Sequence, residues 1–458
     1  MERLSRLLLI VFLLPTYGHA FCGYYVSKAD TKLFNKASKV ILVRDGDRTV
    51  LTMANDFKGD VKEFAMIVPV PTVLEKEQIN VAENAIVDRV DAFTAPRLVE
   101  YYDEDPCAMR MYEKTLAMSA SGGAPMKKGR GAEKDLGVTV EAQYTVGEYD
   151  ILILSAKESS GLLTWLKENE YKIADSAVKT LESYIKQDLK FFVAKVNLKE
   201  LAKSGNEFLR PLQMAYESTK FMLPIRLGTL NADGDQELFV FAVTKKGRVE
   251  TVNYRTVSIP SELELPLLIK DDKQFKKFYQ DMFATAHRRE DAKAVFLEYA
   301  WNMSWCDPCA AEPLTPEELK KIGVFWMNES ERPGVSPMNK ILPRSPRPNA
   351  PVEAYISRLH VRYNAQTFPE DLRFQVTSNQ ENFQGRYILR HPFTGKITCD
   401  AGKEYQKQLV DRSEKEIANL LHVTGWKRSD LPADLASEVP VTDDKDQKKK
   451  KWWQKLWD

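Results

Sequence analysis

The residues of this chain best suited to chemistry are two cysteines three positions apart, Cys306 and Cys309. Two thiols at this spacing can close a small disulfide ring and exchange it with another thiol. Residues 294–301 before them predict an apolar strand, and residues 315–319 after them predict the start of a helix. A helix N-terminus beside the pair would lower the pKa of the first thiol and make it an attacking thiolate. The two cysteines are therefore candidates for a redox-active pair.

The segment Trp305-Cys306-Asp307-Pro308-Cys309 resembles the Trp-Cys-x-Pro-Cys centre of thioredoxin-like oxidoreductases. The resemblance covers five residues only. Where that fold would continue with a strand, a helix and a second strand opened by a proline, this chain runs into the basic, proline-rich residues 329–351. We therefore expect Cys306 and Cys309 to form a structural disulfide across a turn, and keep the oxidoreductase as the alternative.

The number of cysteines limits the disulfides further. The chain has five, at positions 22, 107, 306, 309 and 399, so that at most two bridges form within one chain. With Cys306 and Cys309 paired, Cys107 and Cys399 are the candidates for the second bridge, and Cys22 is the odd thiol. Sequence alone does not fix this connectivity.

The remaining motifs predict neither a metal nor a cofactor. Four scattered histidines, His287, His360, His391 and His422, fit no His-Glu-x-x-His pattern and are expected to be ordinary packed or surface residues. Residues 231–235 resemble a calcium loop but lack glycine at the sixth position, so that a hairpin turn explains them better. The chain has no Gly-x-Ser-x-Gly elbow, phosphate loop or dinucleotide fingerprint.

The first twenty residues predict a signal peptide. Arg3 and Arg6 precede eight consecutive apolar residues, Leu7–Leu14, and Gly18 and Ala20 provide the small side chains that a signal peptidase reads. Eight helical residues span only about 12 Å, far less than the ~30 Å of a bilayer core, which argues against a membrane anchor. We therefore expect export to the periplasm or the cell exterior.

The predicted mature chain begins at Phe21. A lipoprotein is the other possibility, because Cys22 lies just past the cleavage point, but lipid attachment prefers Gly or Ala where Phe21 stands. Removal of the signal leaves equal numbers of basic and acidic residues. A neutral chain has no long-range field to attract polyanions, so nucleic acid is not an expected partner.

The C-terminal residues 443–458 form a basic, tryptophan-rich tail. Tryptophan prefers the bilayer interface and lysine is attracted to anionic headgroups, so the tail is a candidate for docking on a membrane surface. A disordered solubilising tail is the open alternative. The candidate membrane contacts are Lys448, Lys449, Lys450, Lys451, Trp452, Trp453 and Trp457.

The elements around these residues predict an α+β fold with antiparallel, hairpin-rich sheets and packed amphipathic helices. Asp45-Gly46 predicts a type I′ hairpin, and residues 221–230, 237–244 and 248–259 predict sequential hairpin strands. Helices are expected near 85–101, from 271 to about 284 and over 403–422. The expected order is a signal peptide (1–20), an N-terminal strand/helix region (21–118), a flexible loop (119–137), a central α+β region with the Cys-x-x-Cys pair (138–331), a proline-rich connector (332–351), a C-terminal strand/helix region (352–442) and the tail (443–458).

Several segments together resemble the bacterial family catalogued as domain of unknown function 2330. They are residues 21–26, 49–57, 64–71, 302–313, 387–392 and 395–402. The resemblance implies an exported protein and supplies no activity and no functional residue. We therefore expect an exported cell-envelope protein with a binding or structural role. The alternatives are a thiol–disulfide oxidoreductase that uses Cys306 and Cys309, and a peripheral membrane protein docked by its tail.

Overall fold

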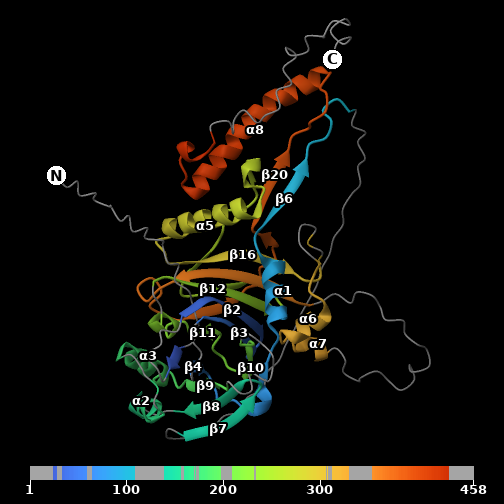
Figure 1. Ribbon diagram of the computed structural model, residues 1–458. Coiled ribbons are helices and arrows are strands. Elements are labelled where there is room, and N and C mark those ends of the chain that lie inside the picture. The colour runs from blue at the N-terminus through green and yellow to red at the C-terminus, as the bar shows by residue number, and fades with distance from the viewer. Residues whose placement is uncertain are drawn as a thin grey trace, which may run out of the picture.

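The fold of the chain is seen in a computed structural model (Figure 1). It describes residues 24–27, 34–58, 64–108, 139–155, 159–169, 171, 175–197, 209–231, 234–305, 307, 312–329 and 353–432. The predicted signal peptide, the loop 119–137, the connector 332–351 and the tail 443–458 lie outside these residues, as do Cys22, Cys306 and Cys309.

A nine-stranded sheet forms the middle layer of the molecule (Figure 1). Most neighbouring strands are antiparallel, but β12 runs parallel to β2, and β14 runs parallel to β16. In spatial order the strands are β14 (Arg255–Ser258), β16 (Ala294–Asn302), β17 (Tyr355–Tyr363), β12 (Gln236–Thr244), β2 (Phe34–Asp45), β3 (Arg48–Lys58), β10 (Leu212–Glu217) and β5 (Ile79–Val81), with β19 (Phe383–Gln384) paired to β16.

A five-stranded antiparallel sheet packs against one face of the nine-stranded sheet. Its outer face is covered by α2 (Ser159–Glu168) and α3 (Asp175–Ile185). The strands are, in order, β1 (Tyr24–Ser27), β4 (Phe64–Val70), β9 (Lys190–Val196), β8 (Tyr149–Ser155) and β7 (Thr139–Val146).

Helices cover the opposite face of the nine-stranded sheet. One part packs against α1 (Asn84–Thr94), α6 (Pro316–Lys321) and α7 (Trp326–Glu329), and the β14–β16 end packs against α5 (Asp272–Arg289). Because both faces are covered, residues 238–243 of β12 are an unbroken apolar run, in which Leu238, Val240 and Ala242 face one layer and Phe241 and Val243 face the other.

A small α/β module lies beyond α5. Its three-stranded parallel sheet has the order β15 (Leu263–Leu265), β20 (Arg386–His391) and β6 (Arg97–Tyr102), and its apolar core is shared with α5 and α8 (Asp400–Thr424). A further small sheet joins β11 (Met222–Leu223), β18 (Leu372–Val376) and β13 (Val249–Thr251). Short 3-10 helices η1 (Lys76–Gln78), η2 (Gly228–Asn231), η3 (Leu267–Ile269) and η5 (Arg428–Asp430) complete the described elements.

The α+β class predicted from sequence is confirmed, with local corrections. The first hairpin turns at Gly46-Asp47, because Asp45 pairs with Arg48, and only Gly46 has positive φ, the pattern of a type II′ turn. The first predicted helix ends at Thr94. Pro96 disfavours the helical conformation of the preceding residue, and the chain continues as β6.

Two further expectations about strands were wrong. Residues 221–230 contain only the two-residue β11 and the 3-10 helix η2, because Pro224 interrupts the run. The strands over 237–259 do not pair as sequential hairpins. Instead β12 lies between β17 and β2, and β13 and β14 belong to different sheets. Each of these strands pairs with strands that are distant in sequence, and local turn signals carry no information about such long-range pairing.

Candidate functional site

A row of cationic side chains lies on the helix-covered face of the central strand β17. Side chains of a strand alternate between its two faces. On one face Tyr355, Leu359, Val361 and Tyr363 join the core between the two sheets. The other face carries Arg358, His360 and Arg362. Arg358 is 5% exposed and His360 is 4% exposed, so these charges require buried partners.

Glu298 of β16 is the central partner and is fully buried. The register between β16 and β17 shifts between Leu297 and Tyr299, so Glu298 is the extra residue of a β-bulge. Its carbonyl accepts a hydrogen bond from Gly385 N at 2.7 Å. The carboxylate binds Arg358 Nε at 2.5 Å and His360 Nδ1 at 2.6 Å, and also accepts a hydrogen bond from the hydroxyl of Tyr279 on α5.

His360 lies between two carboxylates. Its Nδ1 contacts Glu298, and its Nε2 lies 2.7 Å from Glu237 Oε2 on β12. Burial alone would lower the pKa of His360, but the two carboxylates outweigh it and raise that pKa. Burial alone would raise the pKa of Glu298, but the charges of His360 and Arg358 outweigh burial and lower that pKa to about 2. The two carboxylates therefore favour the imidazolium form of His360.

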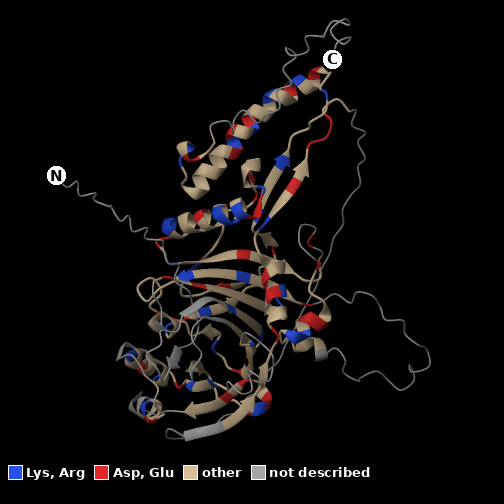
Figure 2. Cartoon of the chain, viewed as in Figure 1, with Lys and Arg blue, Asp and Glu red and all other residues tan. Residues whose placement is uncertain are grey.

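The row of alternating charges continues to the surface at both ends. At one end Arg358 Nη1 binds Asp91 Oδ1 of α1 at 2.5 Å, and Asp91 binds Lys39 Nζ at 2.8 Å. At the other end Glu237 Oε1 binds Arg362 Nε at 2.5 Å. The core of this cluster, Asp91, Arg358, Glu298, His360, Glu237 and Arg362, carries as many positive as negative charges. We call it the buried charge row. Figure 2 shows charged residues on the central strands as well as along α5 and α8.

Aromatic rings enclose the row. The ring of Phe283 on α5 is stacked on His360 with a centroid distance of 3.8 Å. The Phe239 ring lies 4.3 Å from His360, and Arg358 lies over the same ring at 4.7 Å. These rings exclude water and strengthen the charge interactions by lowering the local dielectric. The row therefore joins α1, α5 and three strands, and it favours the protonated form of His360.

This cluster was not predicted from the sequence, from which His360 was expected to be an ordinary packed or surface residue. The signal was present in Arg358-x-His360-x-Arg362, which places three cations on one face of an otherwise apolar strand. The carboxylate partners could not be assigned, because Glu298, Glu237 and Asp91 come from three elements far apart in sequence. The bulge that orients Glu298 has no sequence signature of its own.

The predicted redox pair lies outside the described residues, but two of its neighbours are described. Asp307, between the two cysteines, is buried, and its Oδ2 accepts hydrogen bonds from Tyr299 OH at 3.2 Å and Gln384 Nε2 at 2.9 Å. Trp305 is 68% exposed. The segment is thus anchored to β16 and β19 through the side chain of Asp307.

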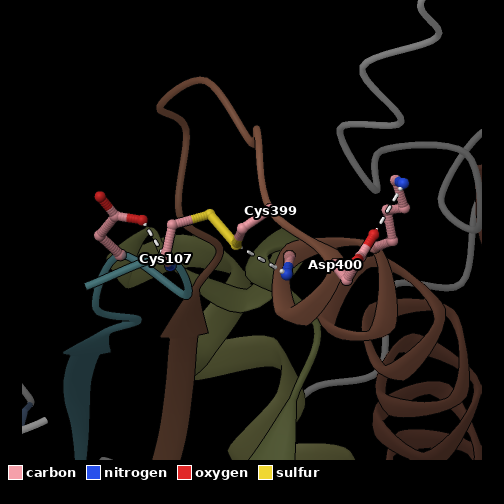
Figure 3. The surroundings of a disulfide bond; sticks show 6 residues. Cys107, Cys399 and Asp400 are labelled. Atoms are coloured by element: carbon pink, nitrogen blue, oxygen red, sulfur yellow. Dashed lines mark hydrogen bonds and ion pairs between the residues drawn. A yellow bond between two sulfur atoms is a disulfide. The ribbon is translucent and has the colours of Figure 1, made fainter. Parts of the chain in front are cut away.

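A disulfide joins Cys107 and Cys399, with 5.8 Å between their Cα atoms and a sequence separation of 292 residues (Figure 3). These are the two cysteines put forward from sequence for the second bridge. Cys107 follows β6, and its N–H donates to Asp105 Oδ1. Cys399 precedes α8, and its Sγ accepts a hydrogen bond from Gly402 N at 3.3 Å. The bridge therefore ties the end of β6 to the start of α8, and we call it the clasp.

Polar contacts reinforce the clasp along α8. Asp103 Oδ2 accepts hydrogen bonds from Tyr405 OH at 2.6 Å and from Arg412 Nη1 at 2.8 Å, both on α8. Glu416, one turn further, lies 3.5 Å from Arg412 Nε. Burial, together with the charges of Glu264 and Asp103, raises the pKa of Glu416 to about 7, although Arg412 opposes the shift.

Two further properties concern the described residues. No group of three His, Cys, Asp or Glu side chains among them is arranged to hold a metal ion. No helix in this part of the chain has the length and apolar character needed to cross a membrane. The predicted membrane contacts of the tail lie outside it.

Comparison with known proteins identifies the family. The model of the family described as "Uncharacterized protein conserved in bacteria (DUF2330)" matches residues 16–375, which include every member of the buried charge row. The chain belongs to this family. DUF2330 membership confirms the resemblance seen in the sequence, although residues 387–392 and 395–402 lie beyond the match, as do Cys399 and α8. No curated protein and no solved structure matches the chain.

Proposed function

We propose that this DUF2330 protein is exported and acts as a binding protein of the cell envelope. The observation that carries the proposal is the Cys107–Cys399 clasp. Disulfides persist in oxidising compartments outside the cytoplasm and are rare inside it. The signal-like first twenty residues point to the same compartment.

The clasp also supports a binding role. It closes a loop of 292 residues and fixes the far end of the α/β module, where β6 and β20 meet α8. Such a covalent tie reduces the conformational freedom that would be lost when a partner binds. The buried charge row holds the sheet beneath this module in one register, because each of its charges is paired only in this arrangement of strands and helices.

Expression of the full chain in a bacterium with and without its periplasmic thiol oxidase tests the export proposal. We expect the protein in the periplasmic fraction, beginning at Phe21, with Cys107 linked to Cys399 in the oxidase-containing strain. N-terminal sequencing and non-reducing mass mapping read these out. A cytoplasmic protein that retains Met1 and has free thiols at both positions would overturn the proposal.

The second candidate function is thiol–disulfide exchange at Cys306 and Cys309. The buried Asp307, which lies between them in the sequence, is the observation that keeps it open, because hydrogen bonds from Tyr299 and Gln384 hold its side chain in place. A catalytic pair should titrate between about −270 and −120 mV, and a structural bridge below about −300 mV. Redox titration with mass mapping of alkylated Cys306 and Cys309 separates them, and insulin reduction would establish the exchange activity.

A further inference from the structure

Strand β6 is the free edge of the three-stranded sheet, with β20 on its other side. Arg97 N and Asp103 N each donate a backbone hydrogen bond of 2.9 Å to the β20 side. Backbone groups alternate in direction along a strand. Leu98, Glu100 and Tyr102 therefore direct their N–H and C=O groups away from β20, and no strand of the described chain pairs with them.

The same strand exposes two consecutive aromatic side chains. Tyr102 is 71% exposed and Tyr101 is 40% exposed. Both rings are held in place, since Tyr102 is stacked on His391 with a centroid distance of 4.4 Å and Arg390 lies over Tyr101 at 5.5 Å. The two rings lie on opposite faces of the sheet, so a strand added at this edge would have an ordered aromatic ring beside it on each face.

The edge is acidic. Glu100 Oε2 accepts from His391 Nε2 at 2.7 Å and from Tyr102 OH at 3.3 Å, and Glu100 Oε1 has no partner among the described residues. Glu104 and Asp105 follow directly and are exposed. The adjoining clasp at Cys107 fixes this end of the strand. An occupant with basic side chains would complement these carboxylates.

A second copy of the chain is disfavoured at this edge in the antiparallel register that brings the two Glu100 residues together. If two β6 strands paired antiparallel with Leu98 opposite Tyr102, Glu100 of one copy would lie opposite Glu100 of the other. Like charges directly opposite one another are destabilising in a sheet. The carboxylates therefore favour a different, basic polypeptide.

We propose that β6 is a docking edge for an extended, basic segment of a partner polypeptide, which adds a strand to the sheet beside Leu98, Glu100 and Tyr102. This inference rests on the proposed binding function and names its site. Main-chain hydrogen bonds to the edge give affinity, and a Lys or Arg opposite Glu100 with apolar residues near Tyr102 gives selectivity.

The test uses the purified, oxidised chain and a fluorescent peptide of alternating lysine and valine, about eight residues long. Anisotropy measures binding, and hydrogen–deuterium exchange measures protection of residues 97–103. We expect saturable binding with new protection confined to this strand. A peptide with glutamate in place of lysine, and one with proline in place of every second residue, serve as controls and should bind at least about tenfold more weakly.

Matched variants at Tyr102 separate the backbone from the side chain. Tyr102→Pro and Tyr102→Thr both remove the ring, and neither removes a hydrogen bond to β20. Only proline also removes the backbone N–H that points away from β20. Tyr102→Pro should therefore lose more affinity for the lysine peptide than Tyr102→Thr. Glu100→Lys should weaken binding of the lysine peptide and strengthen binding of the glutamate peptide, each by about three- to tenfold. Cooperative urea unfolding with the midpoint of the native chain shows that each variant is folded.

Three results would overturn the inference: equal binding of the lysine and glutamate peptides, protection outside residues 97–103, or equal affinity of the two Tyr102 variants. Protection without peptide that grows with protein concentration would assign the edge to a second copy. Protection without peptide that disappears when residues 443–458 are removed would assign it to the chain's own tail. Each outcome leaves the export proposal standing, because fractionation measures export independently.

Discussion

Arg358 is the residue of the buried charge row that pairs with carboxylates from both a strand and a helix. It is almost fully buried, and it binds both Glu298 of β16 and Asp91 of α1. Its removal leaves Glu298 charged in the interior with fewer partners. We expect Arg358→Met to lower the free energy of unfolding by about 3–5 kcal/mol, as measured by urea denaturation.

The control for this prediction is Arg373→Met. Arg373 pairs with Glu370 at 3.1 Å, and both side chains are mostly exposed. Exposed pairs contribute about 0–1 kcal/mol, so this variant should be nearly neutral. Equal losses for the two variants would show that the buried row contributes no more than a surface ion pair.

His360 should make stability depend on pH. Its pKa in the folded chain is raised, so the imidazolium contributes stability that is complete below the unfolded pKa of about 6.5. This contribution is lost as the pH rises through the folded pKa. The stability difference between the native chain and His360→Gln should therefore shrink from pH 5 to pH 9. Glu298 stays ionised over this window, because its pKa lies at about 2.

His287→Gln gives the opposite sign and serves as the matched comparison. Burial lowers the pKa of His287, whose ring contacts the carbonyl of Arg362. The contribution of neutral His287 to the stability of the fold is complete above about pH 6.5, and it is lost as the pH falls through the lowered pKa. Parallel pH profiles for the two variants would contradict the assignment of charge to His360.

At the scale of elements, α8 carries a carboxyl group, Glu416, whose ionised form is destabilised by its burial. The pKa of Glu416 is raised to about 7, so folding favours its protonated form. Stability from this group is complete below about pH 4.5 and declines as the pH rises through about 7. Glu416→Gln, which mimics the neutral form, should raise the free energy of unfolding by about 1–2 kcal/mol at pH 8 and hardly at pH 4. The exposed Glu414→Gln on the same helix is the control, and a gain that is the same at both pH values would refute the assignment.

The clasp should control the order of the α/β module. Cys399→Ser removes the bond between β6 and α8 and leaves the polar contacts of Asp103 with Tyr405 and Arg412. Loss of a native disulfide typically costs about 2–5 kcal/mol. We expect faster hydrogen exchange in β6 and the first half of α8, with the five-stranded sheet unchanged. Cys22→Ser is the control, and an exchange pattern identical to that of Cys399→Ser would count against a local role of the clasp.

Elements with strong local signals were predictable from sequence. The N-cap Asp271 and the apolar stripe of α5 located that helix, although it extends to Arg289. The Thr315–Glu318 capping box likewise located the start of α6. The pairing of β12 with β2 and β17 was not predictable, because it depends on contacts between segments more than a hundred residues apart.

The candidate site shows the same division. The cation row of β17 is visible in the sequence as an alternating pattern, but its pairing with Glu298 depends on a bulge and on sheet order. The pairing of Cys107 with Cys399 emerged from sequence only by setting aside Cys306 and Cys309 as another pair. A charge or a thiol can be recognised in a sequence, whereas its partner is determined by the fold.

For the whole molecule, the C-terminal tail is predicted to decide membrane association. Residues 443–458 hold four consecutive lysines followed by Trp452 and Trp453, with Trp457 four residues further on. Each lysine near an anionic surface contributes about 1 kcal/mol, and tryptophan adds interfacial burial. The mature chain without its tail is close to neutral and gives no comparable attraction.

Vesicle sedimentation of the mature chain with and without residues 443–458 measures this contribution. We expect the full chain to bind vesicles that contain anionic lipid, to bind less as salt is raised, and to ignore neutral vesicles. A variant with Lys448, Lys449, Lys450 and Lys451 changed to Gln tests the charge, and Trp452→Ser with Trp453→Ser tests the apolar contacts. Because electrostatic attraction is screened by salt and interfacial burial is not, the first variant should lose the salt dependence and the second should retain it. Equal partitioning of the full and shortened chains would show that the tail does not dock on membranes and would leave the solubilising role as its explanation.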